Sequence, residues 1–488
     1  MSEFFNQLMI DKLEKRYDPP VTRNKNGDPN GINLHFLAEL AAYTLPLKFI
    51  PEEACYYHYS QEYSLWEPAA DDDVKEKLKD FLFNYRNYFR IKGMDQLVTI
   101  AAITTIMQFM RPHMREERFF YPDSDVSKTV VHVQNGFLQP GANNSCWYLV
   151  DADDTTKREF RSRHRFNVAF APIETCPQFM RFLQDAGLDE DAQRVMQLYF
   201  GQVLLGPNRS QTILLINGEG GSGKSTLLAI LREIIGDESI AVMPYGGLGD
   251  RFTNQAFVGK RLLIGADVKP DFLMTKGGNT LKSLIGGDPI RVEAKGSNSI
   301  FNIDGTFSGT LVSNQRLRLR VEGDHEAWRR RLLSITFSKK RDASCPVNPN
   351  LAKEMLANES SGILNWMLTG ALELLQNNGI IQKSKKQQQA VNDIVDESDS
   401  VNVFCEQILS KGNNSDTVSC DELQTAYATY CINRVWRPLP KREAGLQFGK
   451  NLLSLFRVTQ ATDIFRDGGN KRGYRRIRIN NLKLKEKA

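Results

Sequence analysis

The stretch that decides the fold of this chain is Gly218-Glu219-Gly220-Gly221-Ser222-Gly223-Lys224-Ser225-Thr226. An apolar, β-branched run, residues 212–217, precedes it, and a run of helix-forming residues, 227–231, follows it. Strand, glycine-rich loop and helix are the context that the pattern G-x-x-x-x-G-K-[ST] requires. Glycines let backbone N–H groups surround phosphate oxygens, and the helix directs its positive end at the same anion. Lys224 would reach the β- and γ-phosphates, and Ser225 would join a Mg²⁺ shell. We therefore expect these nine residues to bind ATP.

Hydrolysis also requires a carboxylate that holds Mg²⁺ at the end of a neighbouring buried strand. Residues 260–266 read as a short apolar strand that ends at Asp267, which we expect to be this second metal ligand. A further strand, residues 309–313, ends at Asn314, whose amide would orient the attacking water or sense the γ-phosphate. From the residues alone, both side chains could instead be turn or cap residues.

Two later segments carry basic residues that would act only in an assembly. Arg330 and Arg331 precede the strand-like run 332–337, and either could be an arginine finger for a neighbouring subunit's γ-phosphate. A surface basic cluster is the alternative. Residues 289–301 predict a β-hairpin with Lys295 near its tip. A tip lysine is ordinarily solvated, but in a ring it would grip nucleic-acid phosphates in the channel.

Composition places the chain among ordinary globular proteins, with 41% hydrophobic and 25% charged residues over 488 positions. Seven scattered cysteines form no CxxC pair and no zinc-ligand pattern, which favours reduced thiols. The acidic N-terminus is unlike a signal peptide, and the most apolar run, residues 97–110, is too short to span a bilayer. We therefore expect a cytoplasmic protein of a bacterial host cell, without a membrane partner.

Positive charge is concentrated at the C-terminus. Residues 466–488 carry nine Lys or Arg and two Asp or Glu, a net charge of +7, against +5 for the whole chain. A helix over residues 440–456 and a hairpin over 467–479 with a Gly/Asn-rich wing are typical of a winged-helix DNA-binding module. A solubilising basic tail is the alternative. The basic residues expected to contact DNA are Lys471, Arg472, Arg475, Arg476 and Arg478.

The order of these parts resembles a superfamily 3 helicase of the phage/plasmid and poxvirus-type primase-helicase family, which includes satellite-phage replication proteins. The resemblance is carried by GEGGSGKST, KRLLIGADV, LKSLIGGDPIRVEAKG, GTLVSN and DHEAWRRRLL. It extends upstream through CYYHYSQEYSLWEP, VVHVQNGFL, RFNVAFAPIETCPQFMRFL and LYFGQVLLG, which look like the accessory domain of that group, and downstream into the winged-helix tail. In all it covers most of residues 50–480.

The resemblance implies an AAA+-like ring, a homo-oligomer and usually a hexamer, that translocates on DNA while hydrolysing ATP. Lys224 and Ser225 match the Walker A positions, Asp267 the Walker B acid and Asn314 the sensor. Lys295 falls near the pore hairpin, and Arg330 best matches the finger with Arg331 beside it. Many family members have two adjacent acids at the second motif, where this chain has one, so the general base is unassigned.

The expected fold is α/β, a P-loop AAA+-like ATPase core between an N-terminal α+β accessory domain and a C-terminal winged helix. The expected division is a helical extension over 1–48, the accessory domain over 49–205, the core over 206–345, a helical lid or linker over 346–398, and the winged helix over 399–488. About fifty residues before Cys55 are too few for the primase domain that the family often carries, so we expect unwinding without priming.

Three functions fit the phosphate-binding loop. The first is an ATP-dependent DNA helicase in the replication of a phage, prophage or mobile element. The second is a nucleotide-switched DNA-binding initiator or regulator that does not unwind processively. The third is a small-molecule kinase, which has no use for a basic wing or for an arginine supplied by a neighbour. Strand displacement on a forked substrate distinguishes the first two.

Overall fold

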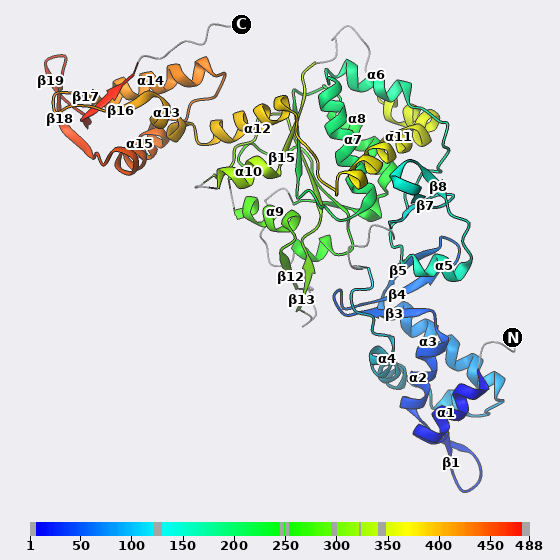
Figure 1. The fold of residues 1–488 in the computed structure, drawn as a ribbon. Coiled ribbons are helices and arrows are strands. Elements are labelled where there is room, and N and C mark those ends of the chain that lie inside the picture. Colours follow the sequence, from blue (N-terminus) through cyan, green and yellow to red (C-terminus); the bar gives the residue numbers. More distant parts are fainter. Residues whose placement is uncertain are drawn as a thin grey trace.

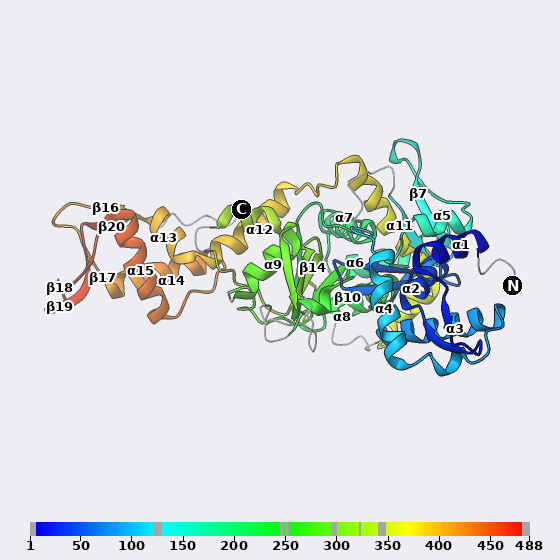
Figure 2. The same ribbon diagram turned by 90° about the horizontal axis from the view of Figure 1, so that it is seen from below.

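The protein is elongated, with its C-terminal part at one end, an α/β core in the middle and a helical N-terminal part at the other end (Figures 1 and 2). The computed structural model describes residues 6–120, 129–244, 248, 253–274, 276–293, 300–321, 324–339 and 348–480. Within these ranges no helix combines the length and the apolar character needed to cross a lipid bilayer.

The core is a five-stranded sheet in the order β10-β11-β14-β9-β15, and every neighbouring pair is parallel. This confirms the expected α/β class. Its strands are β9 (Ile213–Gly218), β10 (Ile240–Val242), β11 (Leu262–Gly265), β14 (Ser308–Ser313) and β15 (Leu332–Phe337). Parallel strands need crossover connections, and the helices in those connections bury both faces of the sheet.

Side chains of β9 alternate between the two faces of this sheet. Leu214 and Ile216 belong to one core cluster, and Ile213 and Leu215 belong to another. The first face is covered by α6 (Pro177–Asp185), α7 (Glu190–Leu205), α8 (Lys224–Ile235) and α11 (Leu351–Gln376). The second is covered by α9 (Lys276–Gly286), α10 (His325–Arg331) and α12 (Lys385–Ser398). A strand buried on both faces is apolar at every position, which is why residues 213–216 show no alternation.

The N-terminal part is a helical cluster joined to small antiparallel sheets. Its helices are α1 (Gln7–Tyr17), α2 (Leu34–Thr44), α3 (Asp71–Tyr88), α4 (Ile100–Met114) and α5 (Asp154–Glu159). Its strands are β1 (Val21–Arg23), β2 (Pro29–Ile32), β3 (Leu47–Ile50), β4 (Cys55–Ser60), β5 (Leu65–Ala69), β6 (Val131–Val133), β7 (Gly136–Pro140) and β8 (Trp147–Leu149). The three consecutive aspartates that begin at Asp71 form the first turn of α3, where carboxylates interact favourably with the positive end of the helix dipole.

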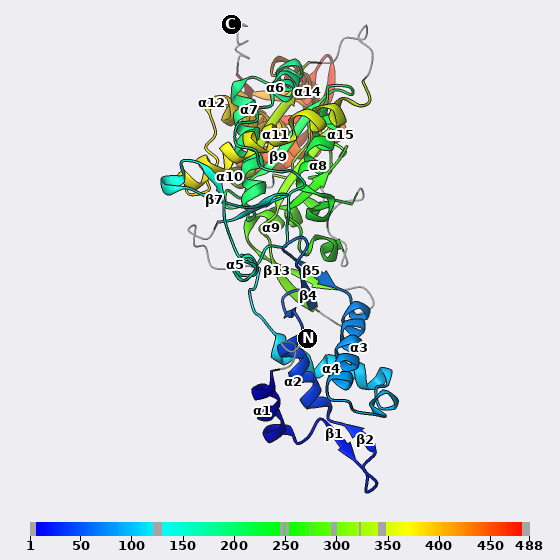
Figure 3. The ribbon, with the colours of Figure 1, turned by 90° about the vertical axis from the view of Figure 1, so that its right-hand side faces the viewer.

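One N-terminal segment is more regular than its composition indicates. The turn-rich residues 19–31, which read as a polar loop, include the antiparallel pair β1–β2. The Asn24 side chain accepts hydrogen bonds from the backbone N–H groups of Asn26 and Asp28, so the turn is closed by its own polar residues. Figure 3 shows this hairpin at the end of the N-terminal part that lies away from the core.

The C-terminal part has the expected helix and basic hairpin, and it also has two further helices and three short strands. The helices are α13 (Ser400–Ile408), α14 (Cys420–Asn433) and α15 (Lys441–Phe456). The hairpin is β18 (Gln460–Arg466) with β19 (Gly469–Arg475), and the additional strands are β16 (Leu409–Lys411), β17 (Thr417–Ser419) and β20 (Ile477–Ile479). β17 extends the hairpin to a three-stranded sheet, and β16 pairs with β20.

Candidate functional site: the loop after strand β9

The loop that follows β9 has the backbone conformation of an anion cradle. Gly218 (φ 157°) and Gly223 (φ 99°) adopt positive φ values that favour glycine. A Cβ on Gly218 would lie 2.7 Å from the carbonyl oxygen of Phe337, so the end of β15 closes one side of the loop. At Gly220 and Gly221 a Cβ would have no heavy atom within 4 Å, so this part of the loop faces open space.

Helix α8 begins directly at the loop, at Lys224. Its N-cap is Gly223, which has no side chain to cap the first turn. The uncapped N–H groups and the positive end of the helix dipole are therefore available to an anion. Lys224 is buried, and its Nζ donates to the carbonyls of Gly218 (2.6 Å) and Glu219 (2.8 Å). Burial lowers the pKa of Lys224 from its ordinary value, and attraction to the Asp267 carboxylate partly offsets this effect.

Asp267 and Asn314, the two polar residues predicted at strand ends, lie side by side. Asn314 Nδ2 donates to Asp267 Oδ1 at 2.8 Å, although 47 positions separate the two residues. Asp267 has φ 50°, a left-handed conformation that is uncommon for a residue other than glycine. Both side chains are exposed. The Ser313 hydroxyl donates to the Val268 carbonyl at 2.9 Å and holds the two strand ends together.

Strand register explains why these groups share one edge. Gly265 pairs with Leu311 in β14, and Ser313 pairs with Asn217 in β9, so the strands end at similar heights. Since the carboxyl ends of parallel strands meet at one edge of a sheet, the loop, Asp267 and Asn314 are neighbours there. This edge therefore combines N–H donors, an ammonium group, a carboxylate and an amide, which together can bind a polyphosphate and polarise it.

The residues at this edge fit a Mg²⁺–triphosphate. Ser225 is exposed in the first turn of α8, and Asp267 is exposed at the same edge of the sheet, after β11, from which β9 is separated by β14. Next to the loop, the buried Asn217 Oδ1 has no hydrogen-bond partner among the described residues, so it can accept one from a ligand or water. The described residues contain no cluster of three or more His, Cys, Asp or Glu that would bind a metal alone. A metal here would therefore share its ligands with the phosphates.

Arg330 and Arg331 lie at the opposite edge of the sheet. Leu332, the residue after them, pairs with Ile213 at the start of β9, whereas the phosphate-loop end of β9 pairs with Phe337. At roughly 3.3 Å per residue, the six-residue strand separates the two edges by roughly 17 Å. Arg330 is exposed. Arg331 is half-buried, and its pKa is lowered mainly by this burial and secondly by repulsion from Arg330.

The hairpin predicted around Lys295 is present as the antiparallel pair β12 (Pro289–Glu293) and β13 (Ile300–Asp304). Lys295 itself lies outside the described residues. In Figures 1 and 3 this pair is on the side of the core that faces the N-terminal part. Ile290, Val292 and Ile303 pack into the core, which attaches the hairpin to the second face of the sheet.

The basic residues predicted to contact DNA are on and beside the β18–β19 hairpin. Three of them form exposed ion pairs, namely Lys471 with Asp467 (2.7 Å), Arg475 with Asp463 (2.6 Å) and Arg478 with Asp416 (3.0 Å). Arg472 and Arg476 are exposed as well. Exposed pairs contribute only about 0–1 kcal/mol each, so a phosphate can replace their carboxylates at little cost.

Sequence reasoning missed two aromatic residues beside the loop. Phe182 in α6 and Phe337 at the end of β15 both lie against Gly223. Phe182 stands in the stretch RFNVAFAPIETCPQFMRFL, but neither ring had been given a role, and the only signal was the apolar character of their elements. Asn217 was also missed, because its unpartnered oxygen becomes visible only when burial is known.

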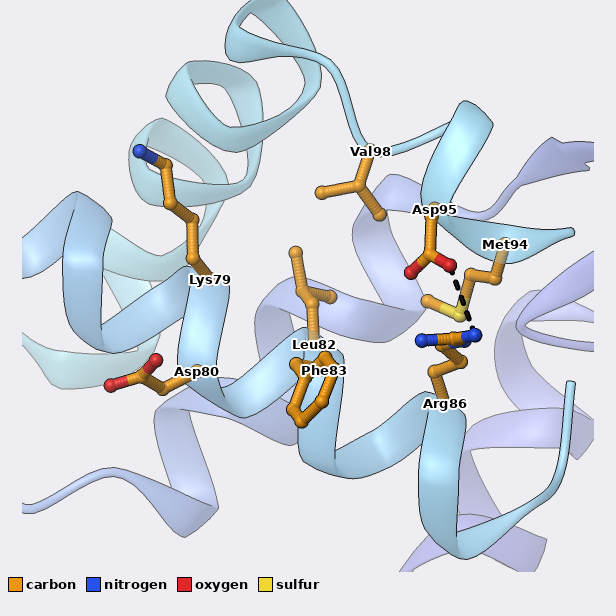
Figure 4. Close-up of a pocket in the computed structure, with 8 residues that line it drawn as sticks. All are labelled: Lys79, Asp80, Leu82, Phe83, Arg86, Met94, Asp95 and Val98. Atoms are coloured by element: carbon orange, nitrogen blue, oxygen red, sulfur yellow. Dashed lines mark ion pairs between the residues drawn. The ribbon is translucent and has the colours of Figure 1, made fainter.

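A separate cavity of about 320 Å³ lies in the N-terminal part between α3 and residues 94–98. Figure 4 shows its lining, with Arg86 pointing toward Asp95, to which it is paired at 3.1 Å. Its other lining residues are Lys79, Asp80, Leu82, Phe83, Met94 and Val98. None of the predicted site residues lines this cavity.

Comparisons with known proteins give one sequence match. A family described as a family of unknown function (DUF5906) matches residues 216–331, a range that runs from the end of β9 to Arg331. No curated protein matches this chain.

A comparison with solved structures matches this chain to three structures of the C-terminal region of NrS-1. An A-form apo structure has a TM-score of 0.46 and 12% identity, and it covers 88% of this chain and 95% of that one. An apo structure of residues 305–718 has a TM-score of 0.46, 11% identity and the same coverages. A further A-form structure has a TM-score of 0.44, 11% identity and coverages of 91% and 99%.

Proposed function

We propose that this protein is an ATP-dependent DNA helicase, a ring-forming replication protein of a phage, prophage or mobile element. The observation that carries the proposal is the single sheet edge where the phosphate-binding sequence meets Asp267 and Asn314, which bond to each other at 2.8 Å. A glycine-rich loop alone binds anions, but a carboxylate and an amide beside it are what nucleotide hydrolysis also requires.

In this proposal each group at the edge has one task. Residues 218–226 cradle the phosphates with their N–H groups, and Lys224 neutralises charge on the β- and γ-oxygens. Ser225 and Asp267 would hold Mg²⁺, which would supply positive charge to offset the charge that develops on the phosphates. Asn314 holds the Asp267 carboxylate in place and orients the attacking water.

The arginines support an assembly. Arg330 and Arg331 lie at the far edge of the sheet from their own loop, so they could approach a γ-phosphate only in another subunit. A head-to-tail contact that repeats the same two surfaces closes into a ring when its rotation permits. We propose a homo-oligomer, most simply a hexamer, with Arg330 as the finger and Arg331 beside it.

The C-terminal part supplies the proposed contact with DNA. Its order of one helix, two short strands, two helices and a basic hairpin supports its assignment as a winged helix, in which β18–β19 would be the wing that follows α15. Lys471, Arg472, Arg475, Arg476 and Arg478 would contact phosphates of duplex or forked DNA. In the ring, the β12–β13 hairpin would carry Lys295 to a single strand in the channel.

The proposal is tested by Lys224→Ala in the full chain. The variant should lose ATP turnover and displacement of a strand from forked DNA, because the ammonium that neutralises the phosphates is gone. Its affinity for DNA should remain within about 2-fold of the wild type when measured without nucleotide, since the wing is unchanged. Lys353→Ala, which removes an exposed lysine from α11, is the matched control and should unwind normally.

Two outcomes would change the proposal. ATP turnover without strand displacement, in a protein whose ring assembly is confirmed, would favour the nucleotide-switched DNA-binding initiator or regulator. Wild-type protein that neither binds nor hydrolyses ATP would overturn the nucleotide site itself.

A further inference from the structure

The strand order gives a direction to any nucleotide on the loop. Asp267 and Asn314 follow β11 and β14, on one side of β9, and β15 is the neighbour of β9 on the other side. The γ-phosphate must face the carboxylate and the amide. An extended nucleoside triphosphate therefore leaves the loop on the β15 side, and its base must lie near the end of β15 and α6.

We propose that Phe182 is the platform on which the base of the nucleotide stacks, and that α6 thereby forms part of the nucleotide site. This inference rests on the proposed function and assigns its base subsite. Phe182 Cε2 lies 2.9 Å from the place that a Cβ on Gly223 would take. Phe337 Cε1 is 3.8 Å from the same place, so two aromatic rings border the β15 side of the loop.

The two rings differ in accessibility. Phe337 is buried at 2% exposure and belongs to the core, whereas Phe182 is only partly buried and packs at the margin of the same cluster. A partly exposed ring beside an anion cradle can offer a π-face to a base, and a buried ring cannot. Phe182 is therefore the ring that a ligand can reach.

Both ends of α6 are fixed, so Phe182 is held beside the loop before any ligand arrives. At its start, the buried Glu359 of α11 accepts hydrogen bonds from the backbone N–H groups of Gln178 (2.8 Å) and Phe179 (2.9 Å). After its end, the N–H of Lys339 donates to the Ala186 carbonyl at 3.2 Å, and the Ser338 hydroxyl donates to the Gly187 carbonyl at 3.1 Å. The chain that leaves β15 is thus tied to the helix that carries Phe182.

Stacking has a consequence for specificity. Every base has a π-face, so an aromatic platform adds affinity for any nucleoside triphosphate and discriminates little between bases. The subsite should therefore strengthen ATP binding relative to a triphosphate without a base, and it should accept other bases with similar affinity.

The test compares two ligands on the full chain by calorimetry in Mg²⁺, namely ATP and inorganic tripolyphosphate. Phe182→Ala should weaken ATP binding about 10-fold and leave tripolyphosphate binding within 2-fold, because only the base contact is removed. Phe182→Leu, which retains apolar packing without a ring, should behave like Phe182→Ala, and Phe182→Trp should restore ATP affinity. Phe83→Ala, which removes an exposed ring from α3, is the control and should change neither affinity.

The outcomes separate this inference from the proposed function. Wild-type protein that binds neither ligand overturns both. ATP binding that is unchanged in Phe182→Ala and Phe182→Leu overturns the base subsite alone. So does an equal loss of both ligands in a Phe182→Leu protein that melts at the wild-type temperature, because the ring would then be supporting the loop and not the base.

Discussion

At the scale of single residues, the loop contains several glycines, and these glycines are not equivalent. Gly218 has φ 157° and is pressed against Phe337, whereas Gly220 has no neighbouring atom within 4 Å of a Cβ. Side-chain chemistry is equally local. Lys224 is buried with its ammonium on loop carbonyls, so its charge is already directed at the place where a phosphate would bind.

We predict that Gly218→Ala destabilises the protein and that Gly220→Ala does not. The new Cβ at Gly218 would meet the Phe337 carbonyl at 2.7 Å, and strain of this kind costs on the order of 1–3 kcal/mol. The melting temperature should fall by roughly 2–4 °C for each kcal/mol of stability lost. Gly220→Ala, with open space around it, should melt within about 1 °C of the wild type. Equal melting temperatures for the two variants would contradict the crowding at Gly218.

At the scale of elements, helix α6 precedes the sheet in sequence, and it is hydrogen-bonded to α11 and, just after its end, to the chain after β15, both of which follow the sheet. Its first turn is capped by a side chain from α11, and the carbonyls of the two residues just after its end accept hydrogen bonds from the chain that leaves β15. Helix N-termini leave backbone donors unpaired, and a buried end needs an acceptor from elsewhere. Glu359 provides that acceptor across 181 positions of sequence, so the position of α6 depends on α11.

We predict that Glu359→Ala destabilises the protein by on the order of 2 kcal/mol, because it leaves two backbone N–H groups of α6 without their acceptor. Glu359→Gln keeps an amide oxygen at the same place and should lose less. Urea unfolding measures both changes. Glu354→Ala, which removes an exposed carboxylate from the same helix, should change stability by about 0.5 kcal/mol or less. If Glu359→Ala and Glu354→Ala unfold at the same urea concentration, the cap contributes nothing.

At the scale of the whole molecule, the sheet separates two groups that hydrolysis would bring together. The loop lies at the carboxyl edge of the sheet, and Arg330 lies at the amino edge. A five-stranded sheet cannot fold back on itself, so under the proposed function a second copy of the chain would have to complete the site. The basic β18–β19 hairpin lies in another part of the chain, at one end of the elongated molecule (Figure 1).

We predict that Lys224→Ala and Arg330→Ala each abolish DNA-stimulated turnover and that a mixture of the two restores it. Loss of an arginine finger lowers turnover by about 10³-fold or more. In rings assembled at random from equal amounts of the two variants, about a quarter of the interfaces join an intact loop to an intact arginine. Turnover should therefore recover to about a quarter of the wild-type rate after subunit exchange.

A matched control for this experiment is Arg329→Ala. The Arg329 side chain is paired with Glu326 and Asp396 inside its own subunit. Any turnover that Arg329→Ala loses should therefore not be restored when this variant is mixed with Lys224→Ala. Mixed rings of the Lys224 and Arg330 variants that stay inactive, with exchange verified by labelled subunits, would argue against a shared site.

Much of the candidate site could be predicted from short stretches of sequence. The loop pattern with its flanking strand and helix identified residues 218–226, and apolar runs bounded by polar residues placed Asp267 and Asn314 at strand ends. The hydrogen bond between those two residues could not be predicted, because it depends on β11 and β14 being neighbours. The division into domains at 49, 206, 346 and 399 stays a prediction.

What the sequence determined by itself is the set of local structures, including the cradle conformation, the α/β class and the acidic start of α3. These follow from the sterics of glycine, from the spacing of apolar residues and from the chemistry of helix ends, all of which act within a few positions. The tertiary structure alone decided which distant residues meet, namely Phe182 with Gly223 and Glu359 with the start of α6. It also decided that Arg330 lies at the edge of the sheet opposite the loop of its own subunit. The reason is that strand order and helix placement come from burying both faces of one sheet, a requirement that involves the whole chain at once.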